Sequence, residues 1–226
     1  MTVKPHPATY SDVIIEKFAH IVHDYAAAAR TVRLLDPFAG TGGIHKIPDL
    51  LGPVDVHIQT YGLEIQPMWA CAHQRTWVGN ALDNGYDDNS FDFIMTSPCY
   101  GNRMADHHNA KDGSKRITYR HYYGEDLEEE NAGTLQWTNP EYKIFHAAAW
   151  AESLRVLKRG GIFVVNISNH IRGGEEMPVV EWHLECLLKL GLFLEYTERV
   201  RTPRMRMGAN AHLRVEYEHI LVMRND

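Results

Sequence analysis

Short apolar runs alternate with longer amphipathic stretches along most of the chain. The apolar runs, which we expect to form buried strands, cover residues 32–35, 58–65, 77–78, 91–95, 162–167, 192–200 and 215–223. Segments of helical character lie between most of them, at residues 67–75, 142–157 and 178–190. Strands that alternate with helices predict an α/β domain, with a mostly parallel sheet that is covered by helices on both faces.

A further helix is expected near the start of the chain. Ser11 and Asp12 are typical N-terminal helix residues, and the apolar residues that share one face behind them are Val13, Ile14, Phe18, Ile21 and Val22. The last two apolar runs have no helical segment between them, so we predict that they form an antiparallel pair. Residues 101–140 are too long for an ordinary connection. We therefore expect one domain over residues 1–226, with a long insertion loop at about 101–140.

The composition agrees with a single globular domain. The 226 residues are 44% hydrophobic and 23% charged, and no apolar run approaches the ~20 residues that span a membrane. The first residues lack the core of a signal peptide. Three scattered cysteines, without C-x-x-C spacing, indicate neither disulfides nor a zinc site. We expect a cytoplasmic protein without a bound metal.

The net charge of −6 is unevenly distributed. Residues 101–124 hold five lysines and arginines against two aspartates, a balance of +3, and residues 198–214 hold five arginines against one glutamate, a balance of +4. Two basic segments on an acidic body suit a local site for phosphates, although solvated loops would have the same composition. The candidate phosphate or base contacts are Arg103, Lys115, Arg116, Arg120, Arg204 and Arg206.

A glycine-rich turn directly follows the first predicted strand, in the sequence LLDPFAGTGG. Glycine at such a position lets a ligand approach the backbone, and ligands bind at the strand ends of parallel sheets. Glu64 lies 22 residues beyond Gly42, the offset at which an acidic residue accepts hydrogen bonds from a ribose. These features predict a nucleotide-like cofactor, and by themselves they fit both a nicotinamide cofactor and S-adenosylmethionine.

The segment DPFAGTGG resembles the first motif of class I S-adenosylmethionine-dependent methyltransferases, especially those that methylate amino groups of nucleic-acid bases. The resemblance implies a Rossmann-like fold with seven strands and S-adenosyl-L-methionine as the cofactor. It also implies that HPATY, residues 6–10, closes over the cofactor, and that GNALD, residues 79–83, contacts the adenine. The cofactor-binding residues implied in this way are Tyr10, Asp36, Pro37, Phe38, Ala39, Gly40, Thr41, Gly42, Glu64, Ile65, Asn80, Ala81 and Thr96.

The segment TSPCY, which follows the fourth predicted strand, resembles the catalytic motif of the same amino-methyltransferases. It matches that motif at Ser97, Pro98 and Tyr100 and departs from it at Cys99, where the family has proline. An exocyclic amino nitrogen is a poor nucleophile because its lone pair is delocalised into the ring. The Ser97 hydroxyl and the Pro98 carbonyl could accept its two hydrogens and localise that pair, while Tyr100 would stack on a base rotated out of the helix.

Cys99 admits a rival interpretation as a cytosine-C5 methyltransferase, in which Pro-Cys supplies the nucleophile. The Glu-Asn-Val tripeptide expected of that class is missing from the sequence, so we rank this mechanism lower. A nicotinamide dehydrogenase is disfavoured because nothing resembles a hydride-transfer acid. A catalytically silent nucleic-acid-binding module is a further alternative.

The favoured function is therefore a DNA methyltransferase that modifies cytosine N4 or adenine N6. Methylation of an RNA base is the main alternative. The expected partner is a nucleic acid, most simply DNA.

Overall fold

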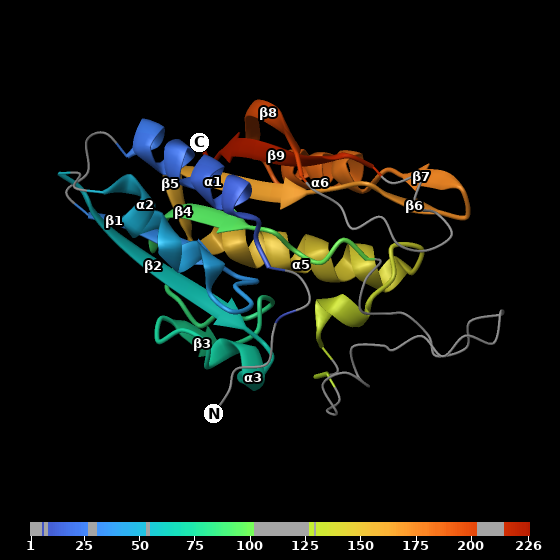
Figure 1. Cartoon of the computed structure of the whole chain (residues 1–226), viewed down its shortest axis with the longest axis horizontal. Coiled ribbons are helices and arrows are strands. Elements are labelled where there is room, and N and C mark those ends of the chain that lie inside the picture. The colour runs from blue at the N-terminus through green and yellow to red at the C-terminus, as the bar shows by residue number, and fades with distance from the viewer. Residues whose placement is uncertain are drawn as a thin grey trace.

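The computed structural model describes residue 6 and residues 9–26, 31–52, 55–101, 127–128, 130–202 and 215–226. The described residues form one seven-stranded sheet with helices on both sides, and a small hairpin (Figure 1). The strands of this sheet are β1 Thr31–Asp36, β2 His57–Glu64, β3 Thr76–Val78, β4 Phe91–Thr96, β5 Leu157–Ile167, β8 Phe193–Arg201 and β9 Tyr217–Arg224.

The strand order is β3-β2-β1-β4-β5-β9-β8. Neighbours from β3 to β5 pair in parallel, whereas β9 runs antiparallel to both β5 and β8. The mostly parallel sheet and the antiparallel pair at the end of the chain are therefore confirmed. Leu35 pairs with Tyr61 on one side and with Ile94 on the other. This register brings the carboxyl ends of β1, β2 and β4 together at one edge of the sheet.

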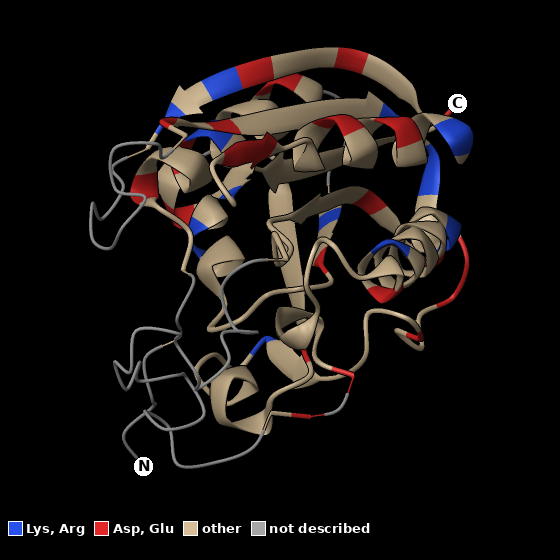
Figure 2. Cartoon of the chain, turned by 90° about the vertical axis from the view of Figure 1, so that its right-hand side faces the viewer, with Lys and Arg blue, Asp and Glu red and all other residues tan. Residues whose placement is uncertain are grey.

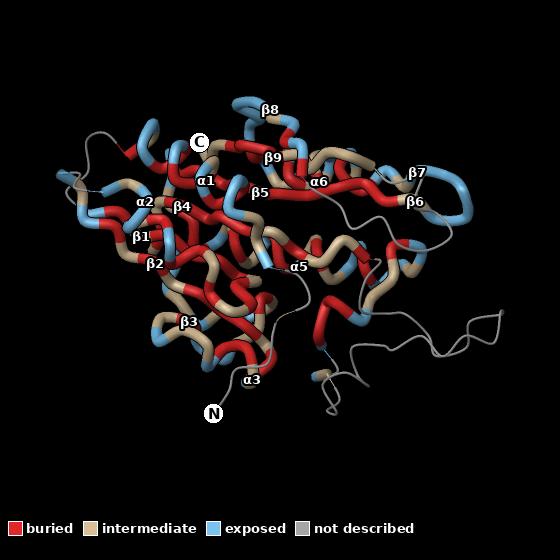
Figure 3. The backbone as a smooth tube through the Cα atoms, viewed as in Figure 1, coloured by how far each residue is buried: buried red, intermediate tan, exposed pale blue. Residues whose placement is uncertain are grey.

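The two faces of the sheet carry different helices. The helices are α1 Asp12–Tyr25, η1 Gly43–Lys46, α2 Ile47–Leu51, α3 Pro67–Ala70, η2 Ala132–Thr134, α5 Pro140–Val156 and α6 Val179–Lys189. Apolar residues of α1, η1 and α2 pack on one face, whereas those of α5 and α6 pack on the other (Figure 1). The strands between these two layers are the most buried part of the chain, and β8 is largely exposed (Figure 3).

The first helix confirms the predicted apolar face with one exception. Ile14, Phe18, Ile21 and Val22 are buried, but Val13 is 41% exposed. Ile15, which was not among the predicted residues, is buried as well, since it lies four and three residues before the buried Ala19 and Phe18 on the same helix face.

The predicted helix over residues 67–75 is mostly wrong. Helix α3 ends at Ala70, and the chain then turns so that the amide of Gly62 in β2 donates to the carbonyl of Arg75. A full helix would have carried the chain past the edge strand β3, which begins at Thr76. The need to pair this short strand with β2 outweighs the local helical pattern.

A second, two-stranded sheet was missed by the sequence analysis. It is the hairpin of β6 His170–Arg172 and β7 Glu175–Met177. Gly173 and Gly174 connect the two strands, and both have positive φ, as the tight hairpin turns require. The Gly-Gly pair was the available signal.

The end of the insertion loop at about 101–140 packs on the domain. Asn131, Ala132 and Trp137 are buried, and the Trp137 amide donates to the Gly101 carbonyl at 3.0 Å. Helix α5 begins at Pro140, two residues before the predicted start, because the Asn139 side chain caps it. Residues 102–126 and 129 lie outside the described part of the chain. Among the described residues, no helix has the length and apolar character needed to cross a membrane.

Candidate cofactor and catalytic site

The turns after β1, β2 and β4 hold the residues that the sequence analysis assigned to cofactor binding and catalysis. We call residues 36–43 the cofactor turn and residues 97–101 the catalytic turn. Because β1 and β4 are adjacent parallel strands, the two turns start side by side. The structure therefore brings both predicted motifs to one edge of the sheet.

Asp36 is fully buried at the start of the cofactor turn. Its Oδ1 accepts the Phe38 amide at 3.0 Å, and its Oδ2 accepts the Tyr10 hydroxyl at 2.7 Å. Burial raises the pKa of the Asp36 carboxyl to about 6, and the hydrogen bond from Tyr10 opposes this rise. Burial, and then the neighbouring carboxylate, raise the pKa of Tyr10 itself, so its hydroxyl stays protonated and donates. Tyr10 thus ties the N-terminal segment to the cofactor turn.

Glu64 at the end of β2 bridges this turn and the next segment. Its Oε2 accepts the Gly40 amide at 3.1 Å, and its Oε1 accepts the Gln66 amide at 2.8 Å. Burial raises the pKa of the carboxyl to about 7, although hydrogen bonds from the backbone of Gln66, Gly40 and Ile65 favour the ionised form. A carboxylate has about four acceptor positions on its two oxygens. The group therefore keeps acceptor capacity for a hydroxyl of a ribose.

The cofactor turn depends on glycine at two positions with positive φ, Gly40 at +55° and Gly42 at +83°. An added Cβ at Gly42 would lie 2.8 Å from atoms of both His45 and His73, so packing within the protein demands glycine there. At Gly40 an added Cβ would lie 3.4 Å from the His6 ring, an ordinary contact. Gly42 is therefore required by packing within the protein, and the approach of a ligand to the backbone of this turn stays a prediction.

The predicted adenine turn, residues 79–83, follows β3. Asn80 Oδ1 accepts the Leu82 amide at 2.9 Å, and Asn80 Nδ2 donates to Glu130 of the insertion loop. The acidic end of that loop therefore reaches the predicted adenine site. Ala81 beside it is buried.

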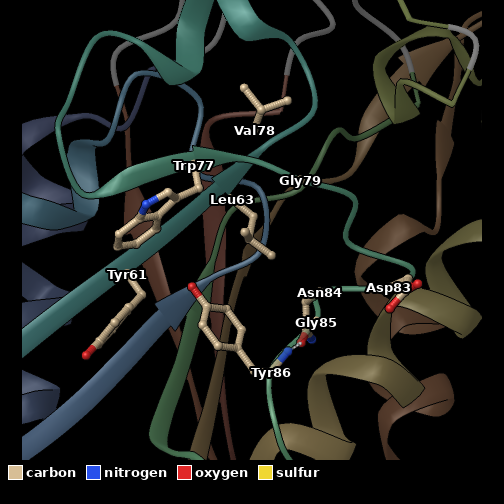
Figure 4. A pocket seen from close by; sticks show the side chains of 9 residues that line it. All are labelled: Tyr61, Leu63, Trp77, Val78, Gly79, Asp83, Asn84, Gly85 and Tyr86. Carbon is tan, nitrogen blue, oxygen red and sulfur yellow. Dashed lines mark hydrogen bonds between the residues drawn. The ribbon is translucent and has the colours of Figure 1, made fainter.

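A hollow of about 520 Å³ adjoins this turn, and the rings of Tyr61, Trp77 and Tyr86 form its wall (Figure 4). Its lining includes residues of the segment 79–90, which connects β3 to β4 without a helix. The Tyr61 and Trp77 rings stack with centroids 5.8 Å apart. The lining residues are Tyr61, Leu63, Trp77, Val78, Gly79, Asp83, Asn84, Gly85 and Tyr86.

In the catalytic turn, Ser97 Oγ lies 2.9 Å from the Tyr100 hydroxyl. Asn166 of β5 donates from Nδ2 to both oxygens, each at 3.2 Å, and to Glu218 Oε2 of β9 at 2.7 Å. The two predicted catalytic side chains are thus joined to each other and to two strands of the sheet. Neither Asn166 nor Glu218 was predicted.

A buried chain of side chains holds the backbone of the catalytic turn. Trp150 Nε1 donates to His183 Nδ1 at 3.0 Å, and His183 Nε2 lies 2.9 Å from the Tyr142 hydroxyl. That hydroxyl donates to the Cys99 carbonyl at 2.9 Å. Because an indole can only donate, every bond runs in one direction and His183 is neutral with its proton on Nε2. Burial also lowers the pKa of His183 well below its usual range.

The remaining predicted residues lie in or next to the two turns. Pro37, Ala39 and Pro98 are buried and Thr96 is fully buried, whereas Thr41 and Ile65 are half-buried. Their contacts with a cofactor stay a prediction. The predicted substrate contacts lie outside the described residues: Arg103, Lys115, Arg116, Arg120, Arg204 and Arg206.

Of the residues that the sequence analysis missed, one could have been recognised from the local sequence and the others could not. Asn166 stands inside the apolar run IFVVNI, so a polar residue at a buried strand position could have revealed it. Tyr142, Trp150 and His183 lie on two helices and occupy ordinary positions of their apolar faces. No local pattern distinguishes them.

Comparisons with known proteins give a fold and no close relative. No protein-family model matches the chain, and no curated protein is similar to it in sequence. Among solved structures, an S-adenosylmethionine-dependent methyltransferase from Methanosarcina mazei is 14% identical, with a TM-score of 0.54 over 91% of this chain and 96% of the other. A 1,6-didemethyltoxoflavin-N1-methyltransferase from Burkholderia thailandensis is 15% identical, with a TM-score of 0.53 over 95% of this chain and 80% of the other.

The chain has the Rossmann-like methyltransferase fold. A structure described as the cyclase SpnF shares it, with 18% identity and a TM-score of 0.56 over 98% of this chain and 85% of the other. One fold therefore accommodates different reactions, and the activity of this methyltransferase-fold protein has to be argued from its own site.

Proposed function

We propose that the protein is an S-adenosylmethionine-dependent methyltransferase that modifies the exocyclic amino nitrogen of cytosine or adenine in DNA. The observation that carries the proposal is the placement of the cofactor turn beside the catalytic turn, on adjacent strands β1 and β4. A methyl donor held by the first turn would lie next to an acceptor held by the second. Fold similarity alone supplies neither the cofactor nor the substrate.

The residues of the cofactor turn fit S-adenosylmethionine. Glu64 has carboxylate lone pairs for a ribose hydroxyl, and Gly40 adds no side chain of its own to the turn, next to the His6 ring. Asn80 and Ala81 follow β3, the strand next to Glu64, where the adenine would lie. When bound, the cofactor supplies an electrophilic methyl group on a sulfonium.

The catalytic turn would prepare the nucleophile. Ser97 Oγ and the Pro98 carbonyl would accept the two amino hydrogens, so that the nitrogen lone pair turns toward the methyl group. The new bond is nitrogen to carbon, the broken bond is carbon to sulfur, and one amino proton is lost to solvent. This route uses no covalent enzyme intermediate and requires no thiol at Cys99.

Two glutamates beside the predicted site, Glu130 and Glu218, each accept a hydrogen bond from an asparagine. Figure 2 shows that acidic residues are spread over the described part of the chain together with lysines and arginines. Phosphates would therefore need the cations of residues 101–124 and 198–214, most of which lie outside the described residues.

The test is to incubate the protein with isotope-labelled S-adenosylmethionine and unmodified DNA or RNA, and to identify methylated nucleosides by mass. We expect N4-methylcytosine or N6-methyladenine, and a loss of about 10²- to 10³-fold in the Ser97→Ala variant with cofactor affinity unchanged. A 5-methylcytosine product would identify the rival mechanism. Cofactor binding without any methylated base would indicate a silent binding module.

A further inference from the structure

Asn166 is the polar residue of β5 that reaches the catalytic turn. It is 2% exposed and lies among apolar neighbours of the strand. Its Nδ2 atom is 2.7 Å from Glu218 Oε2 and 3.2 Å from both Ser97 Oγ and the Tyr100 hydroxyl. The amide nitrogen of Asn166 thus contacts the two hydroxyls of the catalytic turn and the carboxylate of Glu218.

Glu218 determines which end of the Asn166 amide faces the site. An ionised carboxylate can only accept hydrogen bonds, so it selects the nitrogen end of the amide and repels the oxygen end. Strand register keeps the two side chains together, since Asn166 pairs with Ile220 and Glu218 lies two residues away on the same face. Asn166 Oδ1 is left buried, without a hydrogen-bond partner in the described structure. The amide keeps this orientation even though its own acceptor goes unsatisfied.

The second hydrogen of the amide then points at Ser97 and Tyr100. A hydroxyl has one hydrogen and two lone pairs. If Ser97 donates to Tyr100 and accepts from Asn166, a single lone pair of Ser97 Oγ stays available. A donor at position 166 therefore leaves Ser97 as an acceptor, whereas an acceptor there would draw both hydroxyl hydrogens toward itself.

We propose that Asn166, oriented by Glu218, is a positioning residue that keeps one lone pair of Ser97 Oγ directed at the target amino group. The inference rests on the proposed amino-methylation. It adds that the rate of methyl transfer depends on whether the side chain at position 166 donates a hydrogen bond to Ser97 or accepts one from it.

An exchange of the amide and the carboxylate between positions 166 and 218 separates the effect of hydrogen-bond direction on kcat from its effect on stability. In Asn166→Asp two carboxylates meet at the contact with Glu218, so both the melting temperature and kcat should fall. In Asn166→Asp/Glu218→Gln the introduced glutamine donates to the introduced aspartate, so the melting temperature should return. The aspartate still presents an acceptor to Ser97, so kcat should remain about 10- to 100-fold low, with an unchanged KM for S-adenosylmethionine.

The chain offers a matched control outside the site. Asn169, two residues beyond the end of β5, donates from Nδ2 to Glu176 Oε1 at 2.9 Å, so the same pair of residue types meets here. Asn169→Asp/Glu176→Gln should leave both the melting temperature and kcat near the wild-type values. If kcat recovers together with the melting temperature in Asn166→Asp/Glu218→Gln, Asn166 only fills space and forms a stabilising hydrogen bond, and the proposal is overturned.

A second readout does not depend on activity. In protein labelled with 15N-asparagine, Glu218→Gln should shift one side-chain amide proton of Asn166, and Ser97→Ala or Tyr100→Phe should shift the other. A lack of response to the two hydroxyl variants would overturn the assignment of this contact. Failure of the wild type to methylate any base would overturn the proposed function, together with the substrate role of Ser97.

Discussion

The cofactor turn and the catalytic turn begin on adjacent strands, yet different parts of the chain hold them in place. In the cofactor turn, Asp36 and Glu64 accept three amides of nearby backbone, from Phe38, Gly40 and Gln66, and one side-chain hydroxyl, from Tyr10. In the catalytic turn, the Trp137 amide donates to Gly101, and the other holding groups are side chains from α5, β5 and β9. Backbone amides are present whatever the residue, whereas a side-chain contact disappears with one substitution.

The two turns should therefore differ in the substitutions that they tolerate. A turn held by backbone amides requires few particular residues, chiefly carboxylates and glycines. A turn held by distant side chains can be adjusted through those side chains without altering its own sequence. Four expected outcomes test this contrast, from the largest effect to the smallest.

His183→Ala should give the largest effect, because it removes the centre of the buried chain behind the catalytic turn. Tyr142 and Trp150 would each lose a partner, and a cavity would remain. We expect the free energy of unfolding to fall by about 2–4 kcal/mol. Urea denaturation measures it, with the exposed His20→Ala as control. Cofactor affinity of the folded variant should be unchanged, and a large loss would show that the two turns are not independent.

Glu64→Ala addresses the other turn. Binding of S-adenosylmethionine should weaken by about 1–3 kcal/mol, the range for a lost charged hydrogen-bond partner. Isothermal titration calorimetry measures this affinity, and the exposed Glu16→Ala is a matched control. Equal affinity in wild type and Glu64→Ala would remove Glu64 from the cofactor site.

The cofactor turn should also respond to pH, because the folded pKa of Glu64 is about 7 against an ordinary value of 4.5. The folded protein therefore binds this proton more tightly than the unfolded chain does. The resulting stability is full below pH 4.5 and is lost as the pH rises to about 7. Relative to Glu64→Gln, the wild type should lose about 2–3 kcal/mol between about pH 5 and 8. Parallel stability curves for the two proteins would contradict the raised pKa.

Cys99→Ser should have the smallest effect. The catalytic turn is held through the Cys99 carbonyl, which a serine keeps, and direct methyl transfer needs no thiol. We expect a change in unfolding free energy within about 0.5 kcal/mol and a kcat close to wild type. If Cys99→Ser abolished methylation in a stable protein, and a fluorinated cytosine trapped the wild type, the C5 mechanism would replace the proposed one.

The same contrast explains what could be predicted from the sequence. The mostly parallel sheet follows from the alternation of strands and helices, and the position of Glu64 near the cofactor turn follows from an acidic residue at the end of the second predicted strand. Helix α3 was overestimated because the pairing of β3 with β2 outweighed its local pattern. The contacts of Ser97 could not be foreseen, because Asn166 lies 69 residues away in the chain and Glu218 a further 52 beyond it.

The position of β9 has a consequence for the order in which the protein folds. In the described sheet, β8 reaches the other strands only through β9, although β9 follows it in the chain. Translation therefore completes β8 before its place in the sheet exists, and β8 must wait until β9 pairs with β5. Such late, long-range pairing slows folding and leaves the edge of β5 open to aggregation meanwhile. Pulse-labelled hydrogen exchange should find the β8 amides protected no earlier than those of β9. Glu218 lies on β9, so the side-chain amide of Asn166 would be oriented only once β9 has paired with β5.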